Sequence, residues 1–121
     1  MWLGSRYATQ PNIIWNLGGD TVADTDAIRA VWRSMAAGLS AGDGGTHLIS
    51  FHPYGGKSST TYWSQTEPFL SFNELQSGHT RDSANYNMVA ADYARSPAKP
   101  IIDFEPNYEN IPNGLNPANP P

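Results

Sequence analysis

The chain has 121 residues, 39% of them hydrophobic and 15% charged, which is enough for one domain and too few for two independent cores. Its net charge is -4 and its seven basic residues are scattered, so they form no stripe that could follow phosphates, and nucleic acid is excluded as an expected partner. The chain has no cysteine for thiol chemistry, no apolar run near the ~20 residues of a membrane span and no signal peptide at its start, so no membrane partner is expected.

The first strand is predicted over residues 12–17. A short surface helix within residues 2–10 precedes it and leads in through Pro11. The continuous apolar run predicts that this strand is buried on both faces. The glycine pair that follows lets the backbone turn sharply beneath a single carboxylate, Asp20, which is expected at the mouth of the fold.

An amphipathic helix is predicted next, from about residue 26 to residue 39, with Thr25 or Asp24 as its candidate cap. Residues at spacings of three and four form its predicted inner stripe: Ala27, Ala30, Val31, Ser34, Met35 and Leu39. A second strand is predicted over residues 47–53. The loop after it is short for a crossover, so we expect at most a brief helix near residues 62–67.

The third strand is predicted from about residue 70 to residue 75, and the fourth over residues 101–104. Between them the sequence predicts a helix over residues 82–95, with an inner stripe of Tyr86, Val89, Ala90 and Tyr93. Residues 107–121 are rich in proline and asparagine without periodicity and predict irregular structure. We therefore expect one domain over residues 1–110 and an irregular tail over residues 111–121.

The alternation of strands and helices predicts an α/β fold with one parallel sheet. Such sheets place function at the carboxyl ends of their strands. The polar residues expected there are Asp20, His52, Gln76, His79 and Glu105. A closed eight-stranded barrel takes ~250 residues, so four strands make roughly half of a (β/α)8 TIM barrel with two unpaired edges. We expect a partial barrel that self-associates through these open edges.

Several motifs occur together, in an order that resembles one protein family. They are Arg6-Tyr7, the run from Pro11 to Asp20 ending in Leu-Gly-Gly-Asp, His52-Pro53 with Ser58-Ser59, Phe72-Asn73, Gln76-Ser77-Gly78-His79, and Asp103-Phe104-Glu105-Pro106 with Tyr108-Glu109. With these motifs the chain resembles the apiosidase-like catalytic domain, a (β/α)8-barrel family of glycoside hydrolases. The resemblance implies that these are barrel strands four to seven, that the substrate is plant-type polysaccharide such as pectin side chains, and that the location is extracellular or periplasmic.

The resemblance also implies that Asp20 is the catalytic acid/base and that Glu105 is the carboxylate of strand seven, acting as the nucleophile. Glycosidic cleavage needs one acid to protonate the leaving oxygen and one carboxylate that faces the oxocarbenium-like centre. At a separation of ~5 to 5.5 Å and an effective dielectric near 20, their repulsion is ~3 kcal/mol, so one carboxyl should hold its proton near neutral pH. Either acid alone is more typical of a helix cap or a salt bridge. Asp103 should point to the opposite face as a structural acceptor.

Polar and aromatic side chains near the same strand ends are candidate substrate contacts: His52, Trp63, Asn73, Gln76, His79, Tyr108 and Glu109. The amides can donate to and accept from vicinal hydroxyls, although a buried amide that satisfies loop backbone would look the same. Trp63 is the preferred platform for a sugar ring. The two histidines would also suit a metal-dependent hydrolase, but they lack the close spacing that preorganises metal ligands, so no metal and no cofactor are expected.

The leading hypothesis is a glycoside hydrolase that acts on a carbohydrate substrate with two carboxylates. The alternative is a truncated, catalytically incompetent fragment or a carbohydrate-binding module without turnover. The exposed sheet edges and the missing half of a barrel motivate this alternative.

Overall fold

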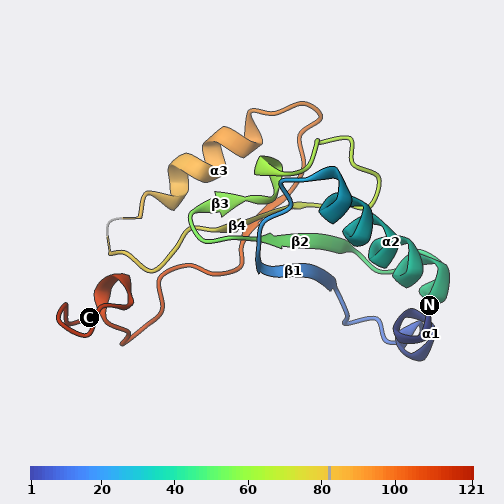
Figure 1. Cartoon of the computed structure of the whole chain (residues 1–121), viewed down its shortest axis with the longest axis horizontal. Coiled ribbons are helices and arrows are strands. Elements are labelled where there is room, and N and C mark those ends of the chain that lie inside the picture. The colour runs from blue at the N-terminus through green and yellow to red at the C-terminus, as the bar shows by residue number, and fades with distance from the viewer. Residues whose placement is uncertain (82) are drawn as a thin grey trace.

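A computed structural model describes residues 1–81 and 83–121 of the chain. Short strands occupy the middle of the molecule, with helix α2 (Asp26–Asp43) on one side and helix α3 (Asn85–Tyr93) on the other (Figure 1). The N-terminal helix α1 (Trp2–Tyr7) packs beside α2, and the two termini lie at opposite ends of the long axis. The predicted mixed α/β character with parallel strands is confirmed. None of the described helices has the length and apolar character needed to cross a membrane.

Strands β1 (Trp15–Thr21) and β2 (Ile49–Pro53) form a two-stranded parallel sheet. Trp15 lies opposite Ile49 and Gly18 lies opposite His52, and the register then shifts before Thr21. The shift occurs where Gly18, Gly19 and Asp20 all adopt positive φ, at 89°, 99° and 51°. This irregularity bends the strand end, so Asp20 lies in a bulge and not in a loop beyond the strand. The strand also starts three residues later than the predicted residue 12.

Three further strands form a separate sheet in the order β3 (Lys57–Ser58), β4 (Asn73–Gln76), β5 (Ile101–Asp103). The pair β4–β5 is parallel and the pair β3–β4 is antiparallel. The expected single parallel sheet is therefore wrong. β3 pairs with β4 at Leu75 and Gln76. Among the described residues β2 lies beside β4 without ladder pairing, and just before β4 the N–H of Ser71 donates to the Ile49 carbonyl at 2.8 Å.

Helix α2 begins at its predicted cap, because the Thr25 hydroxyl accepts from the N–H of Ile28, and it ends at Gly44 in the left-handed conformation. Its predicted inner stripe is confirmed at Leu39 and wrong at Val31 and Met35, because the helix turns a neighbouring face toward the core. Val31 and Met35 are 57% and 45% exposed, whereas Ala36 is buried and the larger residues Ile28, Trp32 and Leu39 pack on the core. The bulky aromatic Trp32 sets the phase of the helix, because its ring packs edge-on to Phe51 at 5.7 Å.

Helix α3 also presents a different face from the predicted one. Tyr86 and Tyr93 are 71% and 69% exposed, and the buried residue of the helix is Asp92. Its carboxylate accepts hydrogen bonds from the hydroxyls of Ser58 and Thr60, so a polar contact and not an apolar stripe holds α3 to the strands. The predicted first residue of this helix, Asp82, lies outside the described residues.

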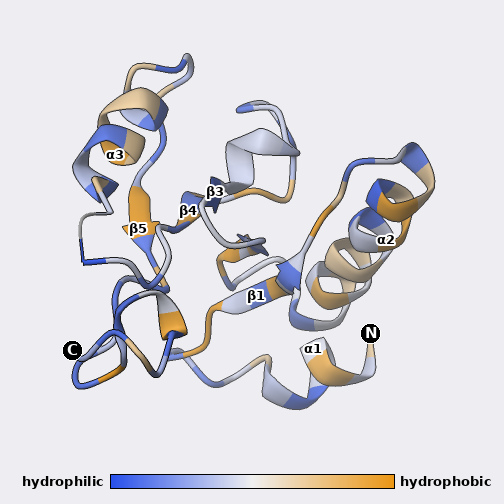
Figure 2. Cartoon of the chain, turned by 60° about the vertical axis from the view of Figure 1, so that its left-hand side comes forward, coloured by the Kyte–Doolittle hydropathy of each residue, from blue (hydrophilic) through white to orange (hydrophobic). Residues whose placement is uncertain are grey.

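The apolar core lies between α2 and the first sheet and consists of Leu17, Ala23, Ala36, Ile49, Phe51, Trp63 and Leu70. Figure 2 shows the hydrophobic segments of α2 and the polar tail at the C-terminal end. Only Leu17 of β1 is buried, so the prediction of a strand covered on both faces is wrong. The predicted brief helix occurs earlier, as the 3₁₀ turn η1 (Ser59–Thr61), and the tail contains one such turn, η2 (Asn113–Leu115).

Candidate active site

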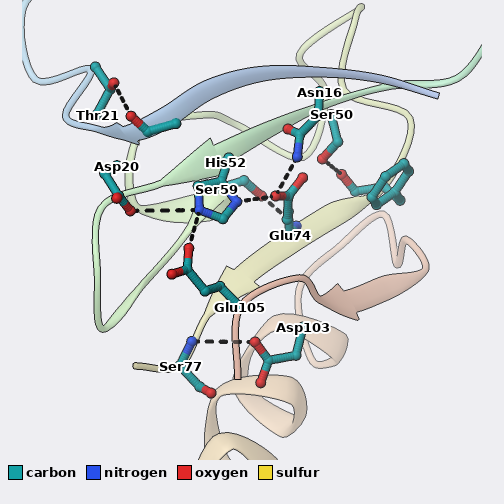
Figure 3. A network of polar contacts seen from close by, with 12 residues as sticks. Asn16, Asp20, Thr21, Ser50, His52, Ser59, Glu74, Ser77, Asp103 and Glu105 are labelled. Atoms are coloured by element: carbon teal, nitrogen blue, oxygen red, sulfur yellow. Dashed lines mark hydrogen bonds and ion pairs between the residues drawn. The ribbon is translucent and has the colours of Figure 1, made fainter. Parts of the chain in front are cut away.

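The two predicted acids come from different sheets and meet around one histidine. His52 lies near the end of β2, and its Nε2 is 3.0 Å from Glu105 Oε2 and 3.7 Å from Asp20 Oδ1 (Figure 3). One ligand atom from each of Asp20, His52 and Glu105 lies within 4.8 Å of the other two. The bulge of β1 delivers Asp20 to this point, and the segment after β5 delivers Glu105. The structure therefore brings the two acids to the same rim, with His52 between them.

Glu105 is held by three side chains. The Tyr108 hydroxyl donates to Oε1, His79 Nε2 lies 3.1 Å from the same oxygen, and His52 contacts Oε2. The hydrogen bond from Tyr108 is the largest influence that lowers the pKa of Glu105; partial burial opposes it and the His52 contact adds to the lowering. The same hydrogen bond raises the pKa of Tyr108, because it stabilises the phenol against ionisation. Glu105 is therefore an ionised carboxylate at neutral pH.

Asp20 differs from Glu105 in its surroundings. Its side chain is 64% exposed, whereas that of Glu105 is 17% exposed. Two carboxylates on one rim, one open to solvent and one enclosed by donors, can take different protonation roles. The arrangement can thus support chemistry that needs a proton donor and an anion on opposite sides of a bound molecule.

Glu74 is a member of this cluster that the sequence analysis missed. It lies in β4 and is fully buried, and its Oε1 lies 2.6 Å from His52 Nδ1 and accepts from Asn16 Nδ2 at 2.9 Å. Burial raises the pKa of Glu74, although the hydrogen bonds from Asn16 and His52 oppose this. The available signal was a charged residue inside an otherwise buried strand, between Asn73 and Leu75.

His79 and Tyr108 are also brought to the site, with their rings 4.3 Å apart. Four other candidates are not. Trp63 is 3% exposed and packs between Phe51 and Phe69 in the core, so it is not an open platform for a sugar ring. Asn73 and Gln76 are buried in β4, where neither side chain contacts the two acids within the described part of the chain, and Glu109 is exposed in the tail.

Asp103 behaves as expected of a strand neighbour that points away from Glu105. Its carboxylate lies 3.4 Å from the N–H of Ser77 and 3.3 Å from Asn85 Nδ2, so it links β5 to the loop and helix beside it.

A cation would find ligand atoms on Asp20, His52 and Glu105, and this set differs from the His52–His79 pair considered from the sequence. Glu105 lies between the two histidines, so both rings are engaged by a carboxylate.

The model of the apiosidase-like catalytic domain family matches residues 1–121, the whole chain. The chain belongs to the apiosidase-like catalytic domain family. It is also similar to a solved glycoside hydrolase family 5 protein from Bacteroides vulgatus, with 40% identity and a TM-score of 0.84 over 99% of this chain and 28% of the other. A second solved structure, described as a glycoside hydrolase, is 39% identical, with a TM-score of 0.84 over 98% of this chain and 29% of the other.

This apiosidase-like chain therefore spans less than a third of the length of the solved structures that it matches. No curated protein matches it. The resemblance seen in the motifs is confirmed by the family match, and glycoside hydrolase is the class of its structural neighbours.

Proposed function

We propose that this apiosidase-like chain supplies the two catalytic carboxylates of a glycoside hydrolase. The observation that carries the proposal is the meeting of Asp20 and Glu105 at His52, with one atom from each of the three within 4.8 Å of the others. The bulge of β1 and the end of β5 are separated by some 80 positions in sequence, so a chance pairing of acids is a weaker explanation than a shared task.

In this proposal Glu105 is the nucleophile. Tyr108 and His52 keep it ionised, so its carboxylate can attack the anomeric carbon as the glycosidic bond breaks. Asp20 gives its proton to the leaving oxygen and afterwards takes one from the water that releases the sugar. Carboxyl groups ~5 to 5.5 Å apart are typical of retaining enzymes, and the compact cluster favours retention of configuration.

We propose further that the four parallel strands of this chain correspond to about strands four to seven of a (β/α)8 barrel, and that the substrate is a plant-type polysaccharide such as a pectin side chain. The first part is supported by the likeness to glycoside hydrolases more than three times as long. The second rests on the family alone. His79 and Tyr108 are the proposed substrate contacts nearest to Glu105.

The test uses a chimera in which residues 1–121 replace the matching region of the Bacteroides vulgatus protein. We expect Asp20→Asn to lower kcat by about 10²- to 10⁴-fold, and much less for a substrate whose leaving group needs no proton. Glu105→Gln should abolish turnover for both substrates. Asp103→Asn removes an acid next to the cluster and is the matched control, with near-parental activity. If both site variants keep full activity, or if sugar binds without turnover in the parent chimera, the assignment is wrong.

A further inference from the structure

Glu74 has no part in the mechanism above, yet it is a fully buried carboxyl group in the centre of β4. A buried carboxyl is unfavourable unless hydrogen bonds compensate for its lost hydration. Its Oε1 is engaged by His52 and Asn16, while its Oε2 has no hydrogen-bond partner among the described residues. An apolar residue of similar size would fill this place in the strand at lower cost, which points to a role other than packing.

The contact between Glu74 and His52 decides which hydrogen faces Glu105. The 2.6 Å contact between Glu74 Oε1 and His52 Nδ1 contains one proton, whichever of the two atoms carries it. The proton belongs either to Glu74, in which case Nδ1 accepts it, or to Nδ1 itself. In both cases Nε2 must carry a hydrogen, because it lies 3.0 Å from the carboxylate of Glu105, which is an acceptor when ionised. The ring is thus held by a carboxyl on each side.

We propose that Glu74 is a positioning residue that holds His52 with its Nε2–H directed at Glu105, so that the nucleophile stays ionised and correctly aimed. The proposal rests on the proposed function of Glu105. The same logic operates in serine hydrolase triads, where a buried carboxylate orients a histidine without touching the substrate. Asn16 completes the arrangement, because its amide donates to the same Glu74 oxygen from β1.

The raised pKa of Glu74 supports this geometry without carrying it. Burial disfavours the ionised form of this carboxyl, and the short contact with His52 Nδ1 compensates for that cost. The consequence for Glu105 is a hydrogen-bond donor that does not rotate away or change tautomer while the nucleophile is ionised.

The first test is NMR of the 121-residue chain with labelled histidine and labelled carboxyl carbons. Glu74→Gln keeps the size of the side chain but removes the carboxyl group, which can ionise and can share a proton with His52. We expect the ring nitrogens of His52 to change their protonation pattern and the pKa of Glu105 to rise. Asp92→Asn is the matched control, because Asp92 is also a buried carboxylate but bonds Ser58 and Thr60, and it should leave the His52 signals unchanged. Unchanged His52 and Glu105 signals in Glu74→Gln would overturn the proposal.

If Glu74→Gln does not fold, Asn16→Ala serves in its place. Asn16 is exposed, and its loss removes only one donor to Glu74, so the same signals should move in the same direction by a smaller amount. A parent spectrum in which His52 Nε2 carries no hydrogen while Glu105 is ionised would also overturn the proposal.

The second test measures turnover in the chimera. We expect Glu74→Gln to lower kcat by about 10- to 100-fold with little change in KM, the range typical of residues that orient the ligands of a metal site. The acid limb of the pH profile should move to higher pH. A parental profile in a folded variant would refute the positioning role. If Asp20→Asn and Glu105→Gln leave activity intact but the His52 signals respond to Glu74→Gln, the proposed function fails while the positioning of His52 stands.

Discussion

At the residue scale, the site separates two carboxyl groups by what surrounds them. Glu105 receives hydrogen bonds from Tyr108 and His52, and its pKa is lowered, whereas Glu74 is buried beside the same histidine and its pKa is raised. Both groups contact one imidazole, on opposite nitrogens. Environment, and not residue type, therefore shifts the pKa values of these two carboxyl groups in opposite directions.

Tyr108 offers a direct test of this difference. Tyr108→Phe removes the largest influence that lowers the pKa of Glu105, so the pKa of that carboxyl should rise. Because a nucleophile works only when ionised, the acid limb of kcat/KM in the chimera should move to higher pH, with less change at neutral pH. Tyr86→Phe, on an exposed tyrosine of α3, is the control. A pH profile that superimposes on that of the parent would rule out this role for Tyr108.

At the element scale, a buried polar cluster ties the end of α2 to the start of β1. Asp43 accepts from Trp15 Nε1 at 2.8 Å and contacts His47 Nδ1 at 2.9 Å, and the other ring nitrogen of His47 lies 2.7 Å from the Gln10 carbonyl. Both ring nitrogens of His47 face acceptors, which stabilise the protonated ring and raise its pKa. The Gln10 carbonyl has the larger effect and Asp43 the next largest. Burial acts to raise the pKa of Asp43, but its hydrogen bonds outweigh burial and the net pKa is lowered.

This cluster predicts a pH-dependent stability. A histidine with a raised folded pKa stabilises the fold fully below its unfolded pKa of ~6.5, and the contribution is lost as pH rises through the folded value. The free energy of unfolding of the parent should therefore fall over that range, and His47→Gln should remove this part of the slope. Denaturation at several pH values measures it. Thr46→Ala, which removes an uncharged neighbour, should leave the slope unchanged; an identical slope in His47→Gln would contradict the prediction.

The crossing of α1 and α2 depends on two glycines. A Cβ on Gly42 would lie 2.3 Å from the Met1 carbonyl oxygen, and one on Gly4 would lie 2.3 Å from the Leu39 carbonyl oxygen. We expect Gly42→Ala to destabilise the chain by about 1–3 kcal/mol, or to detach α1, because backbone must move. Gly38→Ala, where the nearest atom is 3.2 Å away, is the control in the same helix. Thermal melts compare them, and equal melting temperatures would show that α1 is not held by close packing.

At the scale of the whole molecule, apolar surface remains open. Val31 and Met35 on the outer face of α2 are exposed, and so is Ile102 of β5. Short strands with unpaired edges and uncovered apolar residues promote association. We therefore propose that the isolated chain self-associates.

Sedimentation over a range of concentrations tests this proposal. The pair Val31→Lys and Met35→Lys should shift the chain toward monomer, because two charges on one helix face oppose apolar contact. The pair Asn87→Lys and Ala91→Lys adds the same charge at the same spacing on α3 and is the control. A monodisperse parent monomer with a sharp cooperative melt would refute the proposal.

The sequence by itself determined the features that depend on local chemistry and on order along the chain. Thr25 starts α2 as predicted, because a hydroxyl cap acts within a few residues, whereas the helix continues past its predicted end at residue 39 to Asp43. The motifs around Asp20, His52 and Glu105 likewise indicated the family, since they lie in a sequence order that the family match confirms. Parallel strand pairing followed from the alternation of strands and helices.

The tertiary structure decided which faces are covered and which polar groups meet. The helix phase followed the packing of Trp32 on Phe51, and Trp63 went into the core, because burial depends on neighbours that are distant in sequence. The split into two sheets came from β3 occupying the edge of β4. Glu74 reached His52 only because β2 and β4 lie side by side, and a contact across 22 positions has no local signal in the sequence.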